Sequence, residues 1–208
     1  MEKVSSPEFV ERATDQRIEH VAAVLREHNV EVLIVEDGEE ARKKVLELIP
    51  DGAEVHYGRS KTLEDIGLTT VLNSDKYDAV RPKYMKLDRQ TQWREIRKLA
   101  SAPDYMVGSV QAVTDKGELV VASATGGQIT PYAAGAGRVI LVVGSQKIVK
   151  DLDEALRRIR EHVFPYEDAR LRQETNGVGT QLLRVLIMYG ERTPGRTTLI
   201  LVRSPLGV

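Results

Sequence analysis

Five consecutive residues in the first third of the chain combine two cations with two hydroxyl side chains. They are Gly58-Arg59-Ser60-Lys61-Thr62, and they stand between a β-rich stretch and an expected helix start. Such a junction offers free backbone N–H groups to an anion, and a guanidinium holds a carboxylate or phosphate through two hydrogen bonds. We therefore expect Gly58, Arg59, Ser60 and Thr62 to bind an anionic small molecule. The alternative is structural, with Ser60 or Thr62 capping the helix and Arg59 paired with a neighbouring carboxylate.

A second candidate is glycine-rich, in the stretch Ala124-Thr-Gly-Gly-Gln128. Glycine lets the backbone approach a ligand closely, so we also expect Gly126 and Gly127 to line a ligand site. Neither nucleotide-binding fingerprint is satisfied, because no Gly-Lys-Ser or Gly-Lys-Thr follows these glycines. Tight turns between short elements would explain the same residues.

The residue types exclude several common chemistries. The chain has no cysteine, which removes disulfides, thiolate nucleophiles and thiolate-ligated iron–sulfur clusters. Its four histidines match no metal-binding spacing, so we expect no metal and no cofactor held by this chain. His56 alone is placed where acid–base chemistry could occur, and no catalytic residue is assigned.

The charge balance disfavours polyanionic partners. The formal net charge is −1, although a local run from Arg81 to Lys98 is basic and carries Tyr84 and Trp93. A local basic run is usually a solvated face or a wall beside an anionic ligand, so we expect no nucleic acid partner. The longest apolar runs, such as 139–143, are far short of the roughly 20 residues that a membrane span requires. The amino terminus carries no apolar stretch of the signal-peptide type, and we expect a cytoplasmic protein.

Helical and β-rich segments alternate along most of the chain. Apolar spacing predicts a helix from Ser6 to about Asn29, and Asp37 with Asp151 should open two later helices through capping boxes. A weaker capping box is expected at Thr62 and Asp65. A further helix is expected over 91–100, and strands over 30–35, 53–57, 105–107, 112–113, 119–122, 139–143, 183–189 and 197–202. This pattern predicts an α/β fold with a mostly parallel sheet covered by helices on both faces. No linker is evident, and we expect one domain over 1–208 with its first helix, 1–30, packed on it.

Several blocks, taken in order, resemble a known family. They are Gly58-Arg-Ser-x-Thr-Leu-x-x-Ile-Gly67, Asp104-Tyr105 to Gly108, Val110 to Val120, and Val139-Ile-Leu-Val-Val-Gly144 through Lys147-Ile-Val149 to Asp151-Leu152. Together they resemble the LUD domain of lactate utilization proteins, nearest to the LutC/YkgG type, over about residues 10 to 205. The sequence departs from the family in two places: Glu174 to Thr180 replaces a cysteine-bearing segment, and Gly126-Gly127-Gln128 replaces Gly-Asn-Arg.

The resemblance implies a fold similar to the NagB/RpiA/CoA-transferase group. It also implies a component of L-lactate (2-hydroxy acid) utilization that works beside iron–sulfur and ferredoxin-like partner subunits, with any cluster held by those partners. Two other functions stay open. One is a stand-alone isomerase, transferase or ligase acting on a phosphosugar, a CoA ester or a folate, for which Glu118 is the nearest candidate nucleophile. The other is a non-catalytic interaction subunit.

Overall fold

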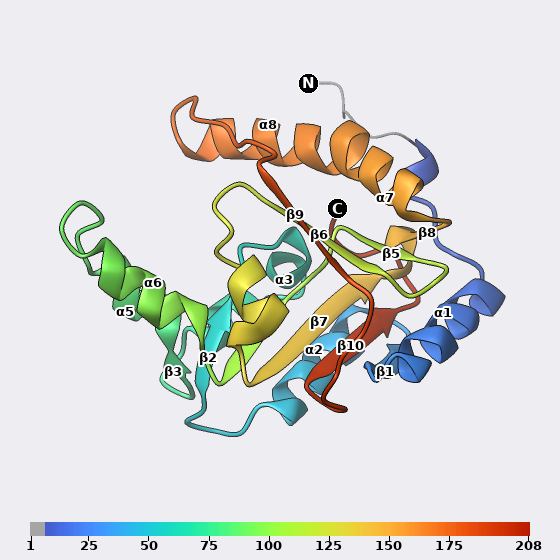
Figure 1. The fold of residues 1–208 in the computed structure, drawn as a ribbon, viewed down its shortest axis with the longest axis horizontal. Helices are drawn as coiled ribbons and strands as arrows, with labels where there is room; N and C mark the ends of the chain where they lie inside the picture. Colours follow the sequence, from blue (N-terminus) through green and yellow to red (C-terminus); the bar gives the residue numbers. More distant parts are fainter. Residues whose placement is uncertain (1–6) are drawn as a thin grey trace.

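A computed structural model describes residues 7–208 of the chain, and Figure 1 shows its arrangement. The helices are α1 (Asp15–Glu27), α2 (Gly38–Leu48), α3 (Lys61–Asp65), α4 (Leu68–Leu72), α5 (Val80–Met85), α6 (Trp93–Ser101), α7 (Leu152–Arg158) and α8 (Phe164–Glu174). The strands are β1 (Glu31–Val35), β2 (Glu54–Tyr57), β3 (Asp78–Ala79), β4 (Tyr105–Gly108), β5 (Ala112–Thr114), β6 (Leu119–Ser123), β7 (Arg138–Gly144), β8 (Ile148–Val149), β9 (Arg184–Met188) and β10 (Thr197–Val202). Short 3-10 turns at Pro7–Phe9 and Ser145–Lys147, and π-helical turns at Pro131–Gly135 and Ile159–Val163, complete the elements.

The strands form two sheets. Six of them build a sheet in the order β1-β10-β7-β4-β2-β3, and every neighbouring pair in it is parallel. A second sheet of four strands has the order β8-β5-β6-β9, with two antiparallel pairs and one parallel pair. The expected α/β class with a mostly parallel sheet is therefore confirmed. The second sheet is an addition, because the sequence pattern of a strand carries no signal of which sheet the strand joins.

The alternation of side chains along the central strand β7 explains how both faces of the large sheet are buried. Val139, Leu141 and Val143 pack on one face against α1 and the second sheet, whereas Ile140 and Val142 pack on the other against α2, α3 and α4. Side chains of a strand point alternately to opposite faces, so a continuous apolar run is what a strand covered on both sides needs. The second sheet is itself covered by α7 and the π-helical segment through a third cluster.

Most of the expected boundaries lie within two residues of the observed ones. Asp37 and Asp151 accept hydrogen bonds from backbone N–H groups of α2 and α7, as capping requires. The expected cap at Thr62 and Asp65 is wrong, because α3 begins at Lys61 and Thr62 is buried inside it. The expected helix over Ser6 to Asn29 is shorter, since α1 begins at Asp15 after Thr14 accepts a capping hydrogen bond; its expected start at Ser6 lies outside the described residues.

Two further differences concern the second half of the chain. The expected strands over 183–189 and 197–202 both form, but β9 belongs to the small sheet and β10 to the large one. The helix opened by Asp151 continues through the π-helical segment into α8, which buries none of its side chains. Because α8 has no buried stripe, apolar periodicity gives no sign of it. Within residues 7–208, no helix has both the length and the apolar character that crossing a membrane demands.

Candidate functional site

The carboxyl ends of three neighbouring strands, β7, β4 and β2, meet at one edge of the parallel sheet. Lys147 ends the short turn that follows β7, Ser109 comes directly after β4, and residues 58–62 follow β2. In open parallel sheets, ligands bind in the crevice outside the carboxyl ends of the strands. The topology therefore brings three chain segments that are far apart in sequence to the place where a ligand is expected.

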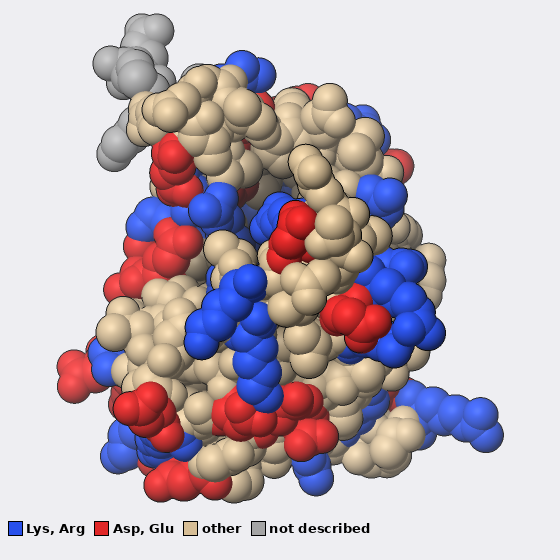
Figure 2. Space-filling model, turned by 90° about the vertical axis from the view of Figure 1, so that its left-hand side faces the viewer, with Lys and Arg blue, Asp and Glu red and all other residues tan. Residues whose placement is uncertain are grey.

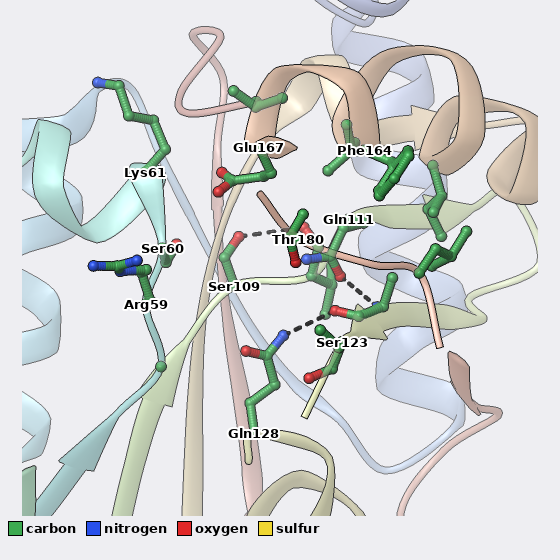
Figure 3. Close-up of a pocket in the computed structure, with 18 of the residues that line it drawn as sticks. Arg59, Ser60, Lys61, Ser109, Gln111, Ser123, Gln128, Phe164, Glu167 and Thr180 are labelled. Atoms are coloured by element: carbon green, nitrogen blue, oxygen red, sulfur yellow. Dashed lines mark hydrogen bonds between the residues drawn. The ribbon is translucent and has the colours of Figure 1, made fainter. Parts of the chain in front are cut away.

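A cavity of about 180 Å³ opens at this edge, between the sheet and α8. One wall is polar and includes Ser109, Gln111, Ser123 and Gln128, which Figure 3 shows below and beside the segment 59–61. The opposite wall is mainly apolar and comes from the π-helical segment, α8 and the segment 180–182. Its apolar members are Ile159, Val163, Phe164, Leu171 and Leu182, and Glu167 adds a carboxylate. The cavity thus offers hydrogen-bonding groups on one side and apolar contact on the other.

Lys147 lies at the centre of a buried polar triangle. Its Nζ donates to Thr62 Oγ1 at 2.9 Å and to Ser109 Oγ at 3.1 Å, and Thr62 Oγ1 donates to Ser109 Oγ at 3.4 Å. All three residues line the cavity, and each is buried. Across residues 7–208, no carboxylate oxygen lies within 4.0 Å of Lys147 Nζ, although ion pairs occur widely elsewhere on the surface. The amine is therefore held by neutral hydroxyls rather than by a counter-ion.

Burial and a neighbouring cation change the acidity of this amine. Loss of hydration, which is the largest cause, and the charge of Arg158 together lower the pKa of Lys147 to about 7, while the carboxylate of Glu167 acts in the opposite direction. Arg158 is itself fully buried, and burial lowers its pKa to about 10, so it stays protonated at neutral pH. Its guanidinium donates to the carbonyl oxygens of Gln111 at 2.6 Å and Phe9 at 3.4 Å. Lys147 and Arg158 are thus buried beside the cavity, and neither is paired with a carboxylate side chain of the described residues.

The backbone at the end of β4 is shaped to hold Ser109. A Cβ added to Gly108 would lie 1.6 Å from Tyr132 Oη, so only glycine lets this ring approach the strand. Tyr132 is buried, and its hydroxyl donates to the carbonyl oxygen of Ser109 at 3.3 Å. Desolvation raises the pKa of Tyr132, which keeps the hydroxyl in its donating form. The close approach therefore fixes the residue that carries one corner of the triangle.

Two glutamines complete the polar wall where β6 ends. Gln111 Oε1 accepts from the Ala122 backbone N–H at 2.8 Å, and Gln128 Nε2 donates to the Ala122 carbonyl oxygen at 3.2 Å. Both amides line the cavity, and Figure 3 shows their hydrogen bonds on the side opposite Arg59. Each amide keeps a second polar atom that can face a ligand, because an amide side chain carries both a donor and an acceptor.

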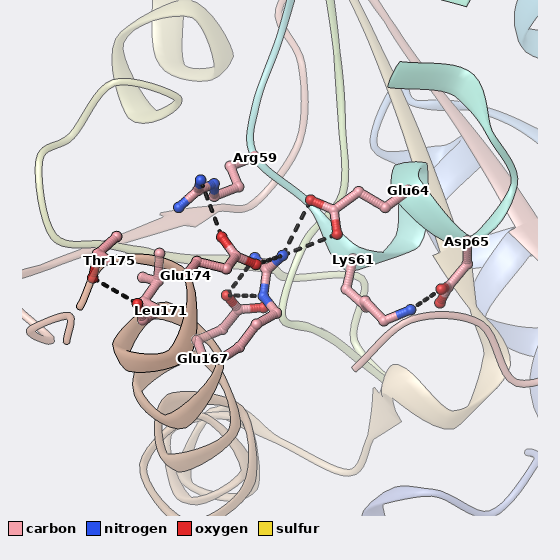
Figure 4. A network of polar contacts seen from close by, with 9 residues as sticks. Arg59, Lys61, Glu64, Asp65, Glu167, Leu171, Glu174 and Thr175 are labelled. Carbon is pink, nitrogen blue, oxygen red and sulfur yellow. Dashed lines mark hydrogen bonds and ion pairs between the residues drawn. The ribbon is translucent and has the colours of Figure 1, made fainter. Parts of the chain in front are cut away.

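The mouth of the cavity is bordered by ion pairs between the segment after β2 and α8. Arg59 pairs with Glu174 at 3.2 Å and Arg170 pairs with Glu64 at 2.9 Å, and Arg170 also pairs within α8 with Glu167 at 2.7 Å (Figure 4). The pairs Arg59–Glu174 and Arg170–Glu64 join α8 to the segment after β2. The expected alternative for Arg59, pairing with a neighbouring carboxylate, is thus present in the structure.

Of the residues expected to bind a ligand, Gly58, Arg59, Ser60 and Thr62 all line the cavity. Lys61 lines it too, but its ammonium pairs with Asp65, and Figure 3 shows its side chain pointing away from Ser109 and Gln128. That these residues bind an anion stays a prediction. The structure also shows a contact that the sequence did not predict, in which Thr62 accepts a hydrogen bond from the buried amine of Lys147.

Gly126 and Gly127 lie outside the cavity lining. Gly126 has a φ of +82° in the turn after β6, a conformation that favours glycine, so the turn alone explains a glycine at this position. Gln128, one residue further on, is the lining residue of this stretch. A ligand role for the two glycines stays a prediction.

Two other candidates also lie away from the cavity lining. His56 is buried, with its ring edge-on to Tyr84, and desolvation followed by the charge of Arg81 lowers its pKa to about 4. Glu118 is buried in the turn between β5 and β6. Neither side chain is placed to act on a molecule in the cavity.

The basic run from Arg81 to Lys98 falls on α5, α6 and the loop between them, which project at the left of Figure 1. Figure 2 faces this side and shows Lys and Arg atoms interspersed with Asp and Glu. Lys83 pairs with Asp78 and Lys98 with Glu95, as on a solvated surface.

Sequence reasoning missed Lys147, Ser109, Glu167 and Arg158. A signal for the first two exists, because each follows closely after a glycine that ends a buried strand, Gly144 or Gly108. Reading the residues after every predicted parallel strand as one cluster would have found them. Arg158 and Glu167 have no such signal, since they come from a helical stretch whose contacts depend on the second sheet. Within residues 7–208, no group of three or more His, Asp or Glu side chains is placed to hold a metal ion.

Comparison of this chain with known proteins identifies the family to which it belongs. The family model described as LUD domain matches residues 18–202. No curated protein sequence matches this chain. A DUF162 family protein from Deinococcus radiodurans is similar in structure at 12% identity and a TM-score of 0.49, over 90% of this chain and 95% of that one. The structure of eIF2B delta from Chaetomium thermophilum matches at 17% identity and a TM-score of 0.35, over 68% of this chain and 54% of that one. The match of the family model to most of the length shows that the chain belongs to the LUD domain family.

Proposed function

We propose that this LUD domain protein binds a small carboxylate, a 2-hydroxy acid or the matching 2-oxo acid, in the cavity at the ends of β7, β4 and β2. The observation that carries this proposal is the buried basic pair of Lys147 and Arg158, neither of which has an acidic partner within 4.0 Å in the described residues. The chain would act as a cytoplasmic component of L-lactate or related 2-hydroxy acid utilization.

The cost of burying charge supports an anionic ligand. Taking an unpaired ammonium or guanidinium out of water is expensive, and proteins normally offset it with a paired acid. Here the amine of Lys147 has only hydroxyl partners, and burial is the largest cause of its lowered pKa of about 7. A carboxylate in the cavity would supply that charge, and its binding would raise the pKa of Lys147 again. The proposal therefore predicts proton uptake on binding near neutral pH.

Arg59 supplies a further cation at the mouth of the cavity. Its pair with Glu174 is exposed, with side chains 44% and 41% accessible. Exposed pairs of this kind contribute only about 0 to 1 kcal/mol, so a ligand carboxylate can replace Glu174 at little cost. The planar guanidinium suits a carboxylate, because it can donate two parallel hydrogen bonds.

The lining and size of the cavity support a small ligand with one polar and one apolar end. Hydroxyl and amide groups of Ser109, Thr62 and Gln128 suit a hydroxyl or keto oxygen beside the carboxylate. The wall of Phe164 and Val163 suits an apolar side chain. A dry cavity of about 150 Å³ accommodates benzene in another protein, so a volume of about 180 Å³ has room for short-chain acids.

Partner subunits complete the proposed activity. Oxidation of a 2-hydroxy acid needs an electron acceptor, and this chain has no cysteine for a thiolate-bound cluster. We propose that iron–sulfur and ferredoxin-like partner subunits carry the electrons, as the likeness to lactate utilization proteins suggests. The chain alone should then give no lactate-dependent dye reduction, and turnover should need the partners.

Binding of defined acids to the purified full-length chain tests the proposal. Isothermal titration with L-lactate, pyruvate and 2-hydroxyisocaproate, each in two buffers of different ionisation enthalpy, measures affinity and proton uptake together. We expect binding by the wild type with proton uptake at pH 7 to 8, and loss of that uptake in Lys147→Met. The control is Lys150→Met, an exposed lysine three residues away. Equal binding by the wild type and Lys147→Met, or preferential binding of a phosphosugar, CoA ester or folate, would overturn the proposal.

A further inference from the structure

We propose that Lys147 is a carbonyl-reactive amine, whose Nζ forms a reversible imine with the keto group of a small 2-oxo acid in the cavity. This inference rests on the proposed function, since it takes the oxo form of the ligand to be one that enters. It adds a covalent step and assigns that step to one residue. Three features support it: the hydrogen bonds of the amine, the charges around it and the groups available to move protons.

The hydrogen bonds of Lys147 leave its nucleophilic position free. A neutral amine has two N–H groups and one lone pair, and the amine here has two acceptors, Thr62 Oγ1 at 2.9 Å and Ser109 Oγ at 3.1 Å. Both N–H groups are therefore used, and the lone pair is not. Lys147 is a lining residue of the cavity, so a ligand carbonyl can reach this amine. Among residues 7–208, it is also the only buried lysine.

The surroundings keep a useful fraction of this amine unprotonated. Burial is the largest cause of the lowered pKa of about 7, and Arg158 on α7 adds a like charge. Desolvation and a neighbouring cation are the two devices by which proteins make lysine nucleophilic near neutral pH. At pH 7 about half of Lys147 is neutral, whereas fewer than about one in a thousand ordinary lysine side chains are. His162 on the π-helical segment and Glu167 on α8 are the other titratable groups whose charges couple to this amine.

The step balances without an oxidant or reductant. The Nζ lone pair attacks the carbonyl carbon, a C–N bond forms, and the carbonyl oxygen takes a proton to give a carbinolamine. Loss of that oxygen as water, with a hydrogen from nitrogen, leaves the C=N bond. Ser109 and Thr62 hold hydroxyls beside the nitrogen and can relay these protons, and Glu167 is a carboxylate in the same lining. The protonated imine carries the same positive charge as the ammonium, so the site still favours the ligand carboxylate.

Neither filling the core nor pairing with an anion requires a lysine at position 147. A lysine that served only to fill the core would be better replaced by an apolar side chain of similar volume. A lysine that served only to pair with an anion would be served as well by arginine, which has no nucleophilic lone pair at neutral pH. Replacement of Lys147 by an apolar side chain removes both its charge and its amine, whereas replacement by arginine keeps the charge and removes the nucleophile. Comparing the two substitutions therefore separates imine formation from charge pairing.

Reductive trapping tests the inference. The full-length chain is incubated with pyruvate or 2-oxoisocaproate and sodium borohydride, and peptide mass spectrometry locates the reduced adduct. We expect one adduct per chain on Lys147, formed at least about tenfold faster than on any exposed lysine, with a rate that rises from pH 6 and levels above about pH 7 to 8. L-Lactate, which has no carbonyl, should give no adduct and should slow trapping by competition.

Variants and a parallel binding assay make the outcomes decisive. Lys147→Arg should still bind pyruvate in titration calorimetry and give no adduct, whereas Lys150→Arg should behave as the wild type. Circular dichroism checks that each variant is folded. Binding of pyruvate without an adduct on Lys147, or adducts spread evenly over exposed lysines, would overturn the imine and leave the proposed function standing. Failure of every acid to bind or to label would contradict both.

Discussion

The two sides of the cavity are held by opposite kinds of force. The sheet side is built on the ends of β7, β4 and β2, where Lys147, Ser109 and Thr62 are buried and joined by hydrogen bonds. The side formed by α8 buries no side chain and is joined to the sheet side by ion pairs, of which Arg59–Glu174 is exposed. Buried packing fixes atoms closely, whereas exposed pairs form and break easily. The sheet side is therefore the more rigid of the two, and α8 is the side held by contacts that form and break more easily.

The largest effect on stability should come from crowding the sheet side. A methyl group added by Gly108→Ala would lie 1.6 Å from Tyr132 Oη and 2.8 Å from its ring. Overpacking of this kind costs about 1 to 3 kcal/mol, and we expect the upper end of that range as a loss in the free energy of unfolding in urea. Addition of Tyr132→Phe should restore part of the loss, because it removes the nearest atom.

Gly127→Ala is the matched control for this substitution. The nearest atom to its added Cβ would be Thr125 Oγ1 at 3.5 Å, an ordinary contact, so its stability should change by less than about 0.5 kcal/mol. Equal effects of the two substitutions would mean that the end of β4 is not the tightly packed region described above.

The next effect concerns the charge of Lys147. Lys147→Met should raise the free energy of unfolding at pH 7 by about 1 to 4 kcal/mol, since it removes a buried charge without a counter-ion and keeps a similar volume. The gain should depend on pH with a defined sign. The folded-state pKa of Lys147 is about 7 and the unfolded value is about 10.4, so between these values the unfolded chain binds a proton that the folded chain lacks.

The stability of the wild type should therefore rise relative to Lys147→Met as the pH increases from about 7 to 10.4. The advantage of the variant should be full below pH 7 and vanish near the upper limit. Urea titrations of both proteins at matched pH values measure this difference, in which the other titrating groups cancel. A difference that does not change with pH would show that the amine of Lys147 titrates normally.

The sequence predicts those parts of the cavity that depend on a local residue pattern, and it does not predict the parts that depend on which strands are neighbours in the sheet. The strand 139–143 was predictable because its continuous apolar run meets the need of a strand buried on both faces, and the segment 58–62 was found from its residue types. The triangle of Lys147, Ser109 and Thr62 was not, because it depends on β7, β4 and β2 being neighbours in the sheet. Sequence order does not reveal strand order. Likewise, α8 has no apolar stripe, so its position over the cavity depends on charges whose partners are about a hundred residues away.

A smaller effect should follow from loosening α8. Arg170→Ala removes ion pairs with Glu64 and Glu167, and its side chain is only 13% exposed. A partly buried network of this kind contributes on the order of 1 kcal/mol, so overall stability should fall little. Hydrogen exchange should nevertheless become faster in α8 and stay unchanged in β7, because the pairs hold the helix locally.

Arg172→Ala is the control on the same helix. Arg172 pairs within α8, with Asp168, and does not reach the segment after β2. Hydrogen exchange measured by mass spectrometry should therefore separate the two variants. If exchange in α8 were unaffected by Arg170→Ala, the helix would be held by something other than the ion pairs of Figure 4.

The smallest effect on stability, with a clear effect on binding, should come from Arg59. Its pair with Glu174 is exposed, so Arg59→Ala should change the free energy of unfolding by only about 0 to 1 kcal/mol. If its guanidinium takes the ligand carboxylate in place of Glu174, the substitution should remove about 1.5 to 3 kcal/mol of binding free energy, which is roughly a tenfold to more than a hundredfold loss of affinity.

Lys61→Ala is the matched control for Arg59, because Lys61 comes from the same segment but pairs with Asp65 and points away from Ser109. Titration calorimetry with pyruvate or L-lactate on the wild type and both variants makes the comparison. Glu174→Gln adds an opposite test, since release of Arg59 from its partner should strengthen binding by up to about fivefold, as expected for an exposed pair of under 1 kcal/mol. Unchanged affinity in Arg59→Ala together with weaker binding in Glu174→Gln would show that the pair itself shapes the mouth. In that case the ligand charge would be held on the sheet side by Lys147 alone.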